Sequence, residues 1–180
     1  MQRLAIRRLT LVAATIATGL AAGFFYAYDV SVTRGHARIS DPAYLEAMQA
    51  INATVRNWKF FAGFFGALIL GAAALALRAR NWRSPTTWLV AAGFGLYAAA
   101  FLVTVAINVP MNEELARVTL SGADLAAVRA GYEPAWNQAN ALRTGLSVAA
   151  FATLVTALAG DHRPRREAQT SPAATASQLL

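Results

Sequence analysis

The chain alternates between four long apolar stretches and shorter polar connections. A helix needs about 20 mostly apolar residues to cross a bilayer. The stretches that meet this length run from Leu9 to Tyr28, from Phe60 to Leu77, from Trp88 to Val109 and from Leu142 to Ala159. None of them has an acidic or basic residue in its interior. The pattern predicts an integral membrane protein with four transmembrane helices.

The first apolar stretch follows a basic leader, an arrangement that it shares with secretory signal peptides. Its apolar run continues through Phe24, Phe25 and Tyr26. That is longer than the apolar region of a signal peptide, which ends after about 15 residues. We therefore favour a retained first span over a cleaved signal.

The connection between the first and second spans carries signals of a helix. Asp41 followed by Pro42 is typical of a helix start, with Asp41 as the N-cap and Pro42 at the first helical position. Apolar residues then recur at helical spacing as far as Val55. This helix is expected to run into the second span through Trp58.

The connection between the third and fourth spans carries similar signals. Pro110 is expected to end the third span, and a short helical turn is expected between residues 113 and 120. Ser121 is expected to cap a helix from Ala123 to Tyr132, and Pro134 to mark the boundary before the fourth span.

The expected fold is therefore all-α: an antiparallel four-helix transmembrane bundle with short extra helices in the two outer connections. Residues 1–160 are expected to form one membrane domain. Residues 161–180 are polar and contain proline, which predicts a disordered cytoplasmic tail.

Composition agrees with the membrane class. The chain is 57% hydrophobic and 14% charged, whereas soluble domains carry about 25% charged residues. Its net charge of +7 raises the question of a nucleic-acid partner. The distribution of the charges along the chain answers this question.

Basic residues gather on one side of the predicted membrane. The leader, the hairpin between the second and third spans, and the tail carry nine arginines against two acids, whereas the other side carries seven bases and seven acids. An excess of arginine marks the cytoplasmic side. We expect a multi-pass protein of the inner (cytoplasmic) membrane with both termini in the cytoplasm. Membrane lipid is its expected partner and nucleic acid is not, and the sequence makes no prediction of oligomeric state.

Polar side chains collect at the outer end of each span, where each group shares one helical face. The four stripes are Thr18, Ala22, Phe25 and Asp29; Gln49, Asn52 and Arg56; Tyr97, Phe101, Thr104 and Asn108, followed by Asn112; and Trp136, Asn140, Arg143 and Ser147.

Two interpretations of these stripes are open. They can converge on a pocket with an aromatic wall and a few polar groups, which suits a flat, apolar ligand carrying some oxygens. Alternatively, the amides bond across helix pairs, Asp29 pairs with Arg143 or Arg56, and the aromatic residues form an interfacial belt.

The sequence predicts no metal or cofactor site. It has no cysteine, and its only histidines, His36 and His162, lie outside the spans on opposite predicted faces. A haem held by two histidines across the bundle is excluded by that placement. Nucleophile-elbow and dinucleotide motifs are absent from the sequence.

Four runs of sequence resemble the anthrone oxygenase-like family of small membrane proteins. They are AGFFYAYD, DPAYLEAMQAIN, VTVAINVPMN and WNQANALRT. The most distinctive parts are the spacing Asn108-x-Pro110-x-Asn112 and the pattern that joins Trp136, Asn140 and Arg143. The similarity extends from about Gly19 to Ala159.

The resemblance implies a cofactor-independent monooxygenase that uses O2 to convert an anthrone-like or other hydrophobic aromatic substrate to a quinone. Such a site needs a base, donors to the enolate oxygen and an apolar cavity. From the chemistry of the side chains we expect Arg143 with Asn140 or Asn108 to stabilise the oxyanion and Asp29 to be the base. The expected substrate-binding residues are Trp136, Asn112, Asn52, Gln49, Phe25 and Tyr97.

A second function is compatible with the same residues. The protein can be a non-catalytic membrane protein, such as a small-molecule-binding or accessory subunit. In that case Asn108, Asn140 and Arg143 are expected to be spent on bonds within the bundle.

The predicted orientation can be tested with a topology reporter. A reporter fused after Ala159 is expected to give a cytoplasmic signal, because that position follows the fourth span on the arginine-rich side. An external signal would refute the orientation.

Overall fold

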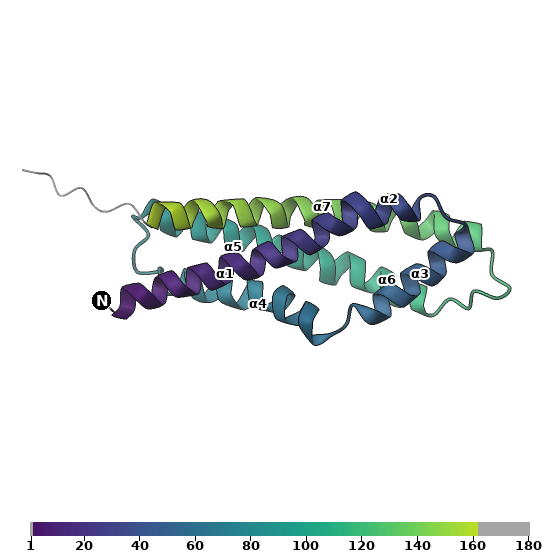
Figure 1. Ribbon diagram of the computed structural model, residues 1–180, viewed down its shortest axis with the longest axis horizontal. Coiled ribbons are helices and arrows are strands. Elements are labelled where there is room, and N and C mark those ends of the chain that lie inside the picture. The colour runs from purple at the N-terminus through teal and green to yellow at the C-terminus, as the bar shows by residue number, and fades with distance from the viewer. Residues whose placement is uncertain (1, 162–180) are drawn as a thin grey trace, which may run out of the picture.

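The computed structural model describes residues 2–161 and is helical through most of them (Figure 1). In chain order the elements are α1 (Gln2–Ala27), the π-turn η1 (Tyr28–Val32), α2 (Thr33–His36), α3 (Asp41–Thr54), α4 (Trp58–Ala76), α5 (Pro85–Val103), the π-turn η2 (Thr104–Asn108), α6 (Val109–Ala116) and α7 (Leu125–Asp161). Four continuous helical segments are long and apolar enough to cross a membrane: Gln2–His36, Trp58–Ala76, Pro85–Ala116 and Leu125–Asp161. The all-α class and the four spans are confirmed.

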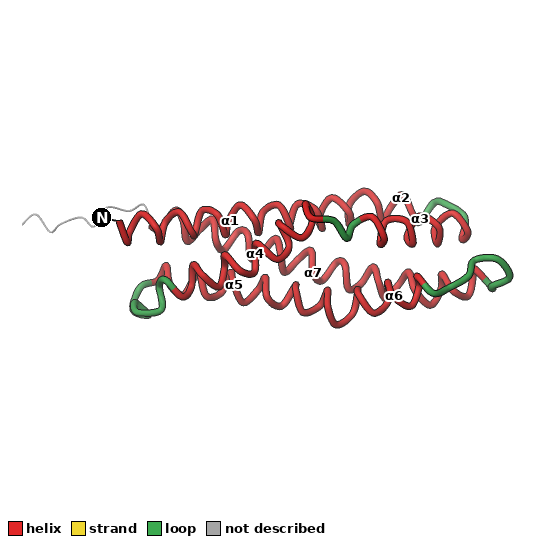
Figure 2. The backbone as a smooth tube through the Cα atoms, turned by 90° about the horizontal axis from the view of Figure 1, so that it is seen from below, coloured by secondary structure: helices red, strands yellow, loops and turns green. Residues whose placement is uncertain are grey.

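The four long helices form a closed ring of neighbours. Helix α1 packs against α4 and α7, and α5 packs against α7 and α4. The start of α1 and the end of α7 lie together at one end of the elongated bundle, and α2, α3 and α6 lie at the other (Figures 1 and 2). We call these the near end, with Gln2 and Asp161, and the far end, with α2, α3 and α6.

The buried side chains form three layers along the bundle. Small and aliphatic residues fill the layer at the near end, around Leu11, Val90 and Leu154. The middle layer adds the aromatic rings of Phe25, Phe64 and Tyr97. The far-end layer is the most aromatic: Tyr28, Tyr44, Leu45, Met48, Leu115, Tyr132 and Trp136.

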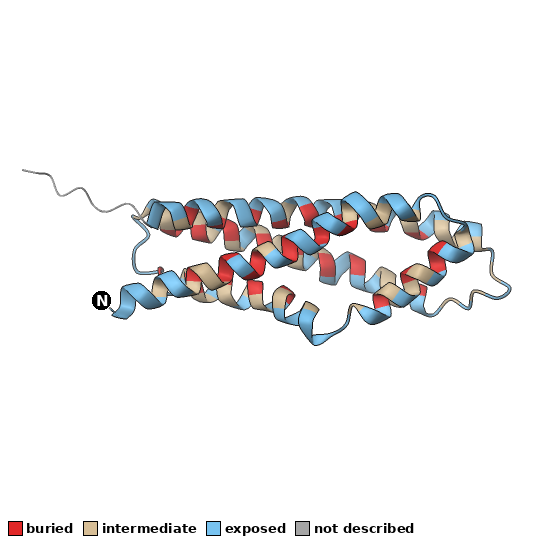
Figure 3. Cartoon of the chain, in the orientation of Figure 1, coloured by how far each residue is buried: buried red, intermediate tan, exposed pale blue. Residues whose placement is uncertain are grey.

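The outer surface of the bundle is apolar along its length. Exposed strips run along the outward face of each long helix, with the buried positions facing inward (Figure 3). Leu20, Ile69 and Leu102 are each more than 60% exposed. Such side chains are suited to lipid rather than to water.

The predicted continuity of α3 with the second span is wrong. Helix α3 ends at Thr54, and α4 begins at Trp58. Between them, the Asn57 side-chain oxygen accepts from the backbone N–H groups of Lys59 and Phe60 at 3.0 and 3.2 Å. This side chain satisfies donors that a helix start leaves open, so it fixes a new start.

Both predicted proline boundaries are also wrong. Pro110 lies in the first turn of α6, directly after η2, and the helical path continues through it to Ala116. Pro134 lies inside the unbroken α7 and is exposed. Its missing N–H frees the carbonyl of Ala130, which is also exposed and can bond to water.

The predicted caps are each displaced. Asp124, not Ser121, caps the start of α7, since its side chain accepts from the N–H of Ala127 at 3.1 Å. Ser40 occupies the N-cap of α3, and Asp41 is its first residue. The tail from residue 162 lies outside the described residues, and Asp161, which we assigned to it, is the last residue of α7.

Arg129, on α7, binds the α2–α3 connection and the start of α3. Its guanidinium pairs with Asp41 at 3.0 Å and with Glu133 at 2.6 Å. It also donates to the carbonyls of His36 and Ile39 at 3.0 and 2.8 Å. The α2–α3 connection and the start of α3 are thereby held on α7.

Helices α5 and α7 pack closely at Gly93, which has no side chain. A Cβ atom on Gly93 would lie 2.8 Å from two Leu154 side-chain carbons, whereas a Cβ on Gly95 would meet nothing within 4 Å. Gly93→Ala is therefore expected to lower the unfolding free energy by about 1–3 kcal/mol, and Gly95→Ala to leave it unchanged or raised. Unfolding of the purified protein in detergent measures both. Equal effects at the two positions would contradict this packing.

Candidate functional site

Two π-turns lie against α7 at the far half of the bundle. The turn η1 follows α1 and carries Asp29, and η2 follows α5 and carries Asn108. Both pack against α7. A π-turn adds a residue to a helical turn and redirects the side chains after it, and such turns are common at functional sites. These two turns direct polar groups toward the stripe on α7.

Arg143 and Asn140 form the centre of a group of buried and half-buried polar side chains that also includes Asp29, which we call the polar layer. Both are buried, Arg143 with 7% of its surface exposed and Asn140 with none. The Asn140 side-chain oxygen accepts from Nε and Nη2 of Arg143 at 3.1 and 2.9 Å. The Asn140 amide nitrogen donates to the Asp29 carboxylate over 3.5 Å. Among residues 2–161, no carboxylate lies within ion-pair distance of Arg143.

Aromatic rings enclose the guanidinium. The Arg143 Cζ atom lies 4.5 Å from the ring centre of Phe25 and 5.3 Å from that of Trp136. A buried cation costs several kcal/mol unless it is compensated. Here an amide oxygen and two ring faces supply the compensation, so the charge is not cancelled by a neighbouring anion.

Asn112 organises the aromatic layer above Arg143. Its side-chain oxygen accepts from the Tyr132 hydroxyl and from the Trp136 indole N–H, each at 2.8 Å. The Asn52 amide donates to the same Tyr132 hydroxyl at 3.3 Å. These bonds join α3, α6 and α7 and fix the plane of the Trp136 ring.

Asn108 is buried without a partner. None of its surface is exposed, and neither its side-chain nitrogen nor its oxygen has a hydrogen-bond partner in the described part of the chain. An unpaired buried amide costs about 1–3 kcal/mol per group. Such a group is suited to a ligand or water molecule that supplies the missing bonds.

Three further stripe residues lie outside this polar layer. Gln49 donates to the carbonyls of Leu115 and Val118, at the end of α6. The Tyr97 hydroxyl donates to the Phe64 carbonyl in the middle layer. Arg56 is paired with Glu113 and is exposed. The structure thus gathers Arg143, Asn140, Asp29, Asn112, Asn52, Phe25 and Trp136, and it leaves Gln49, Tyr97 and Arg56 apart from them.

Tyr28 and Tyr132 belong to the layer but were not predicted. The Tyr28 ring lies 5.2 Å from that of Trp136, and its hydroxyl donates to the Met48 sulfur at 3.1 Å. Tyr132 joins Asn52 to Asn112, as described above. The spacing contained both signals: Tyr132 precedes Trp136 by four residues, and Tyr28 follows Phe25 by three.

An apolar groove of about 970 Å³ lies beside the layer, between α1 and the α3–α4 segment. Its walls include Ile16, Leu20, Phe24 and Phe60, and Tyr28 lines its inner edge. Ile16 and Leu20 are 59% and 66% exposed, so the groove opens on the lipid-facing surface. The Tyr28 ring therefore stands between this groove and Trp136.

The candidate site holds no cluster of metal-binding side chains. Within residues 2–161, no group of three or more His, Cys, Asp or Glu side chains is placed to hold a metal ion. The side chains that the site does offer are a guanidinium, amides, one carboxylate and aromatic rings.

Removing the Asn112 acceptor tests the aromatic layer. Asn112→Leu leaves two buried donors unpaired, so the unfolding free energy is expected to fall by about 1–3 kcal/mol. Asn112→Asp keeps an acceptor oxygen and is expected to lose less. In a background with Trp58, Trp82 and Trp88 changed to Phe, the emission of Trp136 is expected to shift in Asn112→Leu. An unshifted emission would show that this bond does not hold the ring.

Comparison with known proteins gives one match. The family model described as anthrone oxygenase matches residues 56–153, which include α4, α5, both residues of the Asn108–Asn112 spacing and the Trp136–Arg143 pattern. The runs that contain Asp29 and Asn52 lie before the matched residues. Searches of curated proteins and of solved structures gave no match. The match covers more than half of the chain, and the chain therefore belongs to the anthrone oxygenase family.

Proposed function

We propose that this membrane protein is an oxygenase that converts an anthrone-like aromatic substrate to a quinone with O2 and without a cofactor. The observation that supports this most is the buried Arg143–Asn140 pair. It places a cation with no carboxylate partner among residues 2–161 against aromatic rings. A preorganised cation of this kind stabilises negative charge that develops on a substrate oxygen.

The reaction consumes one O2 and releases one water. A base removes a proton from the methylene group of the anthrone, and the electron pair is delocalised onto the ketone oxygen as an enolate. The enolate carbon gives its electrons to O2, a C–O bond forms, and protonation yields a hydroperoxide. Loss of the second methylene hydrogen with cleavage of the O–O bond forms the new C=O group and water. The two steps that the protein must assist are proton removal and stabilisation of the enolate.

The side chains of the polar layer match these two steps. Arg143 holds the enolate oxygen, and Asn140 holds the guanidinium in place through its two bonds. Asp29, half-buried on η1, takes the methylene proton. The unpartnered amide of Asn108 donates to an oxygen of the substrate or of the developing peroxide.

The apolar groove supplies the space for the substrate. Its volume lies at the upper end of the range for small-molecule sites, about 300–1,000 Å³. It opens toward lipid, where a hydrophobic polycyclic substrate concentrates. The Tyr28 ring separates it from Trp136 and is held by one bond to a sulfur atom. In this proposal the substrate displaces that ring and stacks on Trp136.

In this proposal the reaction takes place at the outer side of the inner membrane, and the arginine distribution supports that side. The near end carries the arginine excess, so it faces the cytoplasm in this proposal, and the polar layer lies toward the opposite surface.

A non-catalytic role has its own support. The amides of Asn112, Asn52 and Gln49 are engaged in bonds within the bundle. A small-molecule-binding or accessory subunit needs no more than this. Arg143, Asp29 and Asn108 distinguish the two functions, and the test is directed at Asp29 and at Arg143 with its partner Asn140.

Oxygen uptake by the purified protein with anthrones decides between them. The wild type is expected to form quinone with one O2 consumed per product. Arg143→Ala is expected to lower kcat by a factor of about 10²–10³. The double variant Arg143→Ala, Asn140→Ala is expected to abolish turnover. Asp29→Asn is expected to lower kcat with little change in KM.

Arg56→Ala is the matched control. It removes an arginine from the same end of the bundle, but Arg56 is exposed and paired with Glu113. Its activity should equal that of the wild type. Quinone formation that persists in the double variant would refute the site assignment, and absence of turnover with every anthrone would favour the accessory role.

A further inference from the structure

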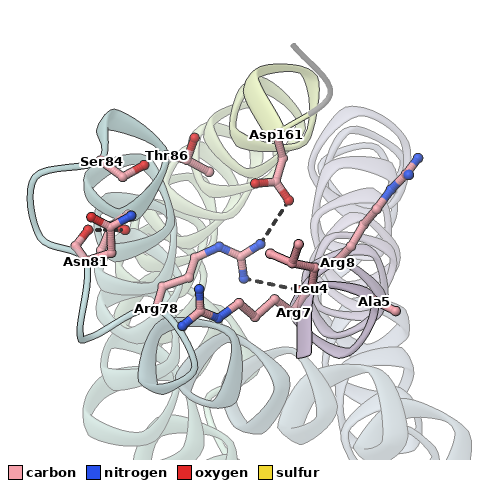
Figure 4. Close-up of a pocket in the computed structure, with 10 residues that line it drawn as sticks. Leu4, Ala5, Arg7, Arg8, Arg78, Asn81, Ser84, Thr86 and Asp161 are labelled. Atoms are coloured by element: carbon pink, nitrogen blue, oxygen red, sulfur yellow. Dashed lines mark hydrogen bonds and ion pairs between the residues drawn. The ribbon is translucent and has the colours of Figure 1, made fainter. Parts of the chain in front are cut away.

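A second hollow lies at the near end, far from the polar layer. It has a volume of about 440 Å³ and is formed by the start of α1, the α4–α5 connection, the start of α5 and the end of α7. Figure 4 shows Arg78 at its centre, with Arg7 and Asp161 on either side and Ser84 and Thr86 on the opposite wall. Arg8 also lines it.

Arg78 is the buried floor of this cavity. Only 5% of its surface is exposed. Its guanidinium donates to the carbonyls of Arg7 and Ala74 at 3.1 and 3.3 Å and to the Asp161 carboxylate at 3.2 Å. One side chain thus joins α1, α4 and α7.

Positive charge exceeds negative charge in the cavity. Among residues 2–161, three arginine side chains line it together with one carboxylate, Asp161. Burial lowers the pKa of Arg78, Asp161 opposes that effect, and the neighbouring charge of Arg7 lowers the pKa further. Two cations that line one cavity are stabilised by an anion that contacts both.

The start of α5 adds further donors. Pro85 begins this 19-residue helix, and the N-cap residue Ser84 makes no side-chain capping bond. Pro85 has no N–H group and the Thr87 N–H donates to the Ser84 carbonyl at 3.0 Å, so the Thr86 N–H is the backbone donor that this helix start can offer. The start of a helix also carries partial positive charge. The hydroxyl groups of Ser84 and Thr86 line the same wall. Arginines, hydroxyls and a helix N–H group together form the donor set that binds phosphate.

The cavity lies at the level of a membrane surface. It is bounded by the ends of two apolar spans, at Ala76 and Pro85. Trp82 and Trp88 follow the lining residues Asn81 and Thr87 in the chain; their rings lie 5.3 Å apart, and both are exposed. Tryptophan at the end of a span marks the headgroup layer of a bilayer. Leu4 and Ala5, which are exposed, complete the wall on the side of α1.

We propose that this near-end cavity binds the phosphate of an anionic phospholipid headgroup. Arg7 and Arg78 hold the phosphate, Ser84, Thr86 and the start of α5 supply further hydrogen bonds, and the acyl chains lie along the apolar surface of the neighbouring helices. Basic pockets between transmembrane helices bind anionic headgroups in this way. The site goes beyond the proposed oxygenase function and does not depend on it.

Lipid titration of the delipidated full-length protein in detergent tests this proposal. Bound lipid is counted by native mass spectrometry during titration with phosphatidylglycerol or phosphatidylcholine. The wild type is expected to bind one phosphatidylglycerol in preference to phosphatidylcholine. Arg7→Gln is expected to weaken that binding about fivefold, the effect of one basic residue near an anionic surface.

Arg3→Gln is the matched control, since it removes the same charge from α1 at a position outside the cavity. It should change binding less than twofold. Thr86→Val provides a second, uncharged change within the cavity and should also weaken phosphatidylglycerol binding. Arg78 is left intact because its loss would separate three helices.

Three results would overturn the proposal. Equal effects of Arg7→Gln and Arg3→Gln would show diffuse attraction in place of a site. Equal binding of the two lipids would show no recognition of the headgroup charge. Complete displacement of phosphatidylglycerol by inorganic phosphate at millimolar concentration would identify a site for free phosphate.

Discussion

Arg143 brings a full positive charge into a bundle whose outer surface is suited to lipid, and the packing of the far half follows from that charge. Water is not available in the apolar part of a bilayer, so buried polar groups must find their partners within the protein. Asn140 supplies an oxygen that accepts from two guanidinium nitrogens. Phe25 and Trp136 supply ring faces, and Asn112 then holds the Trp136 ring. The aromatic character of this layer, compared with the small residues of the near end, reflects the same requirement.

The two π-turns explain how three helices contribute to one layer. In a regular helix, the stripe that contains Phe25 would continue on a fixed face. The extra residue in η1 and in η2 rotates the chain at the level where Asp29 and Asn108 lie. The helical path nevertheless continues beyond each turn, into α2 and α6, and α6 packs against α3.

Helical periodicity predicted the spans, the presence of helices in the outer connections and most members of the polar layer, although it missed Tyr28 and Tyr132 and wrongly included Gln49 and Tyr97. It could not predict their hydrogen bonds. Asn140 and Arg143 were assigned to one face from their spacing, but the spacing does not show that they bond to each other or that Asp29 receives only an amide. The two predicted proline boundaries were wrong for different reasons. At Pro134, the carbonyl of Ala130 that loses its hydrogen bond is exposed, which lowers the penalty for proline within a helix. At Pro110, the preceding π-turn η2 has the same effect. The break at Asn57 was not predicted, because the spacing of apolar residues does not show that the Asn57 side chain caps a new helix.

Helix α7 runs without interruption from Leu125 to Asp161, and its residues enter both the polar layer and the near-end cavity. From Arg143 to Asp161 the helix rises about 27 Å. A continuous helix resists compression, but it tilts and rotates as a rigid rod. A rotation of α7 about its axis at Asp161 therefore also turns the helix at Arg143. Arg78, which binds Asp161, and the aromatic rings around Arg143 are connected through one continuous helix.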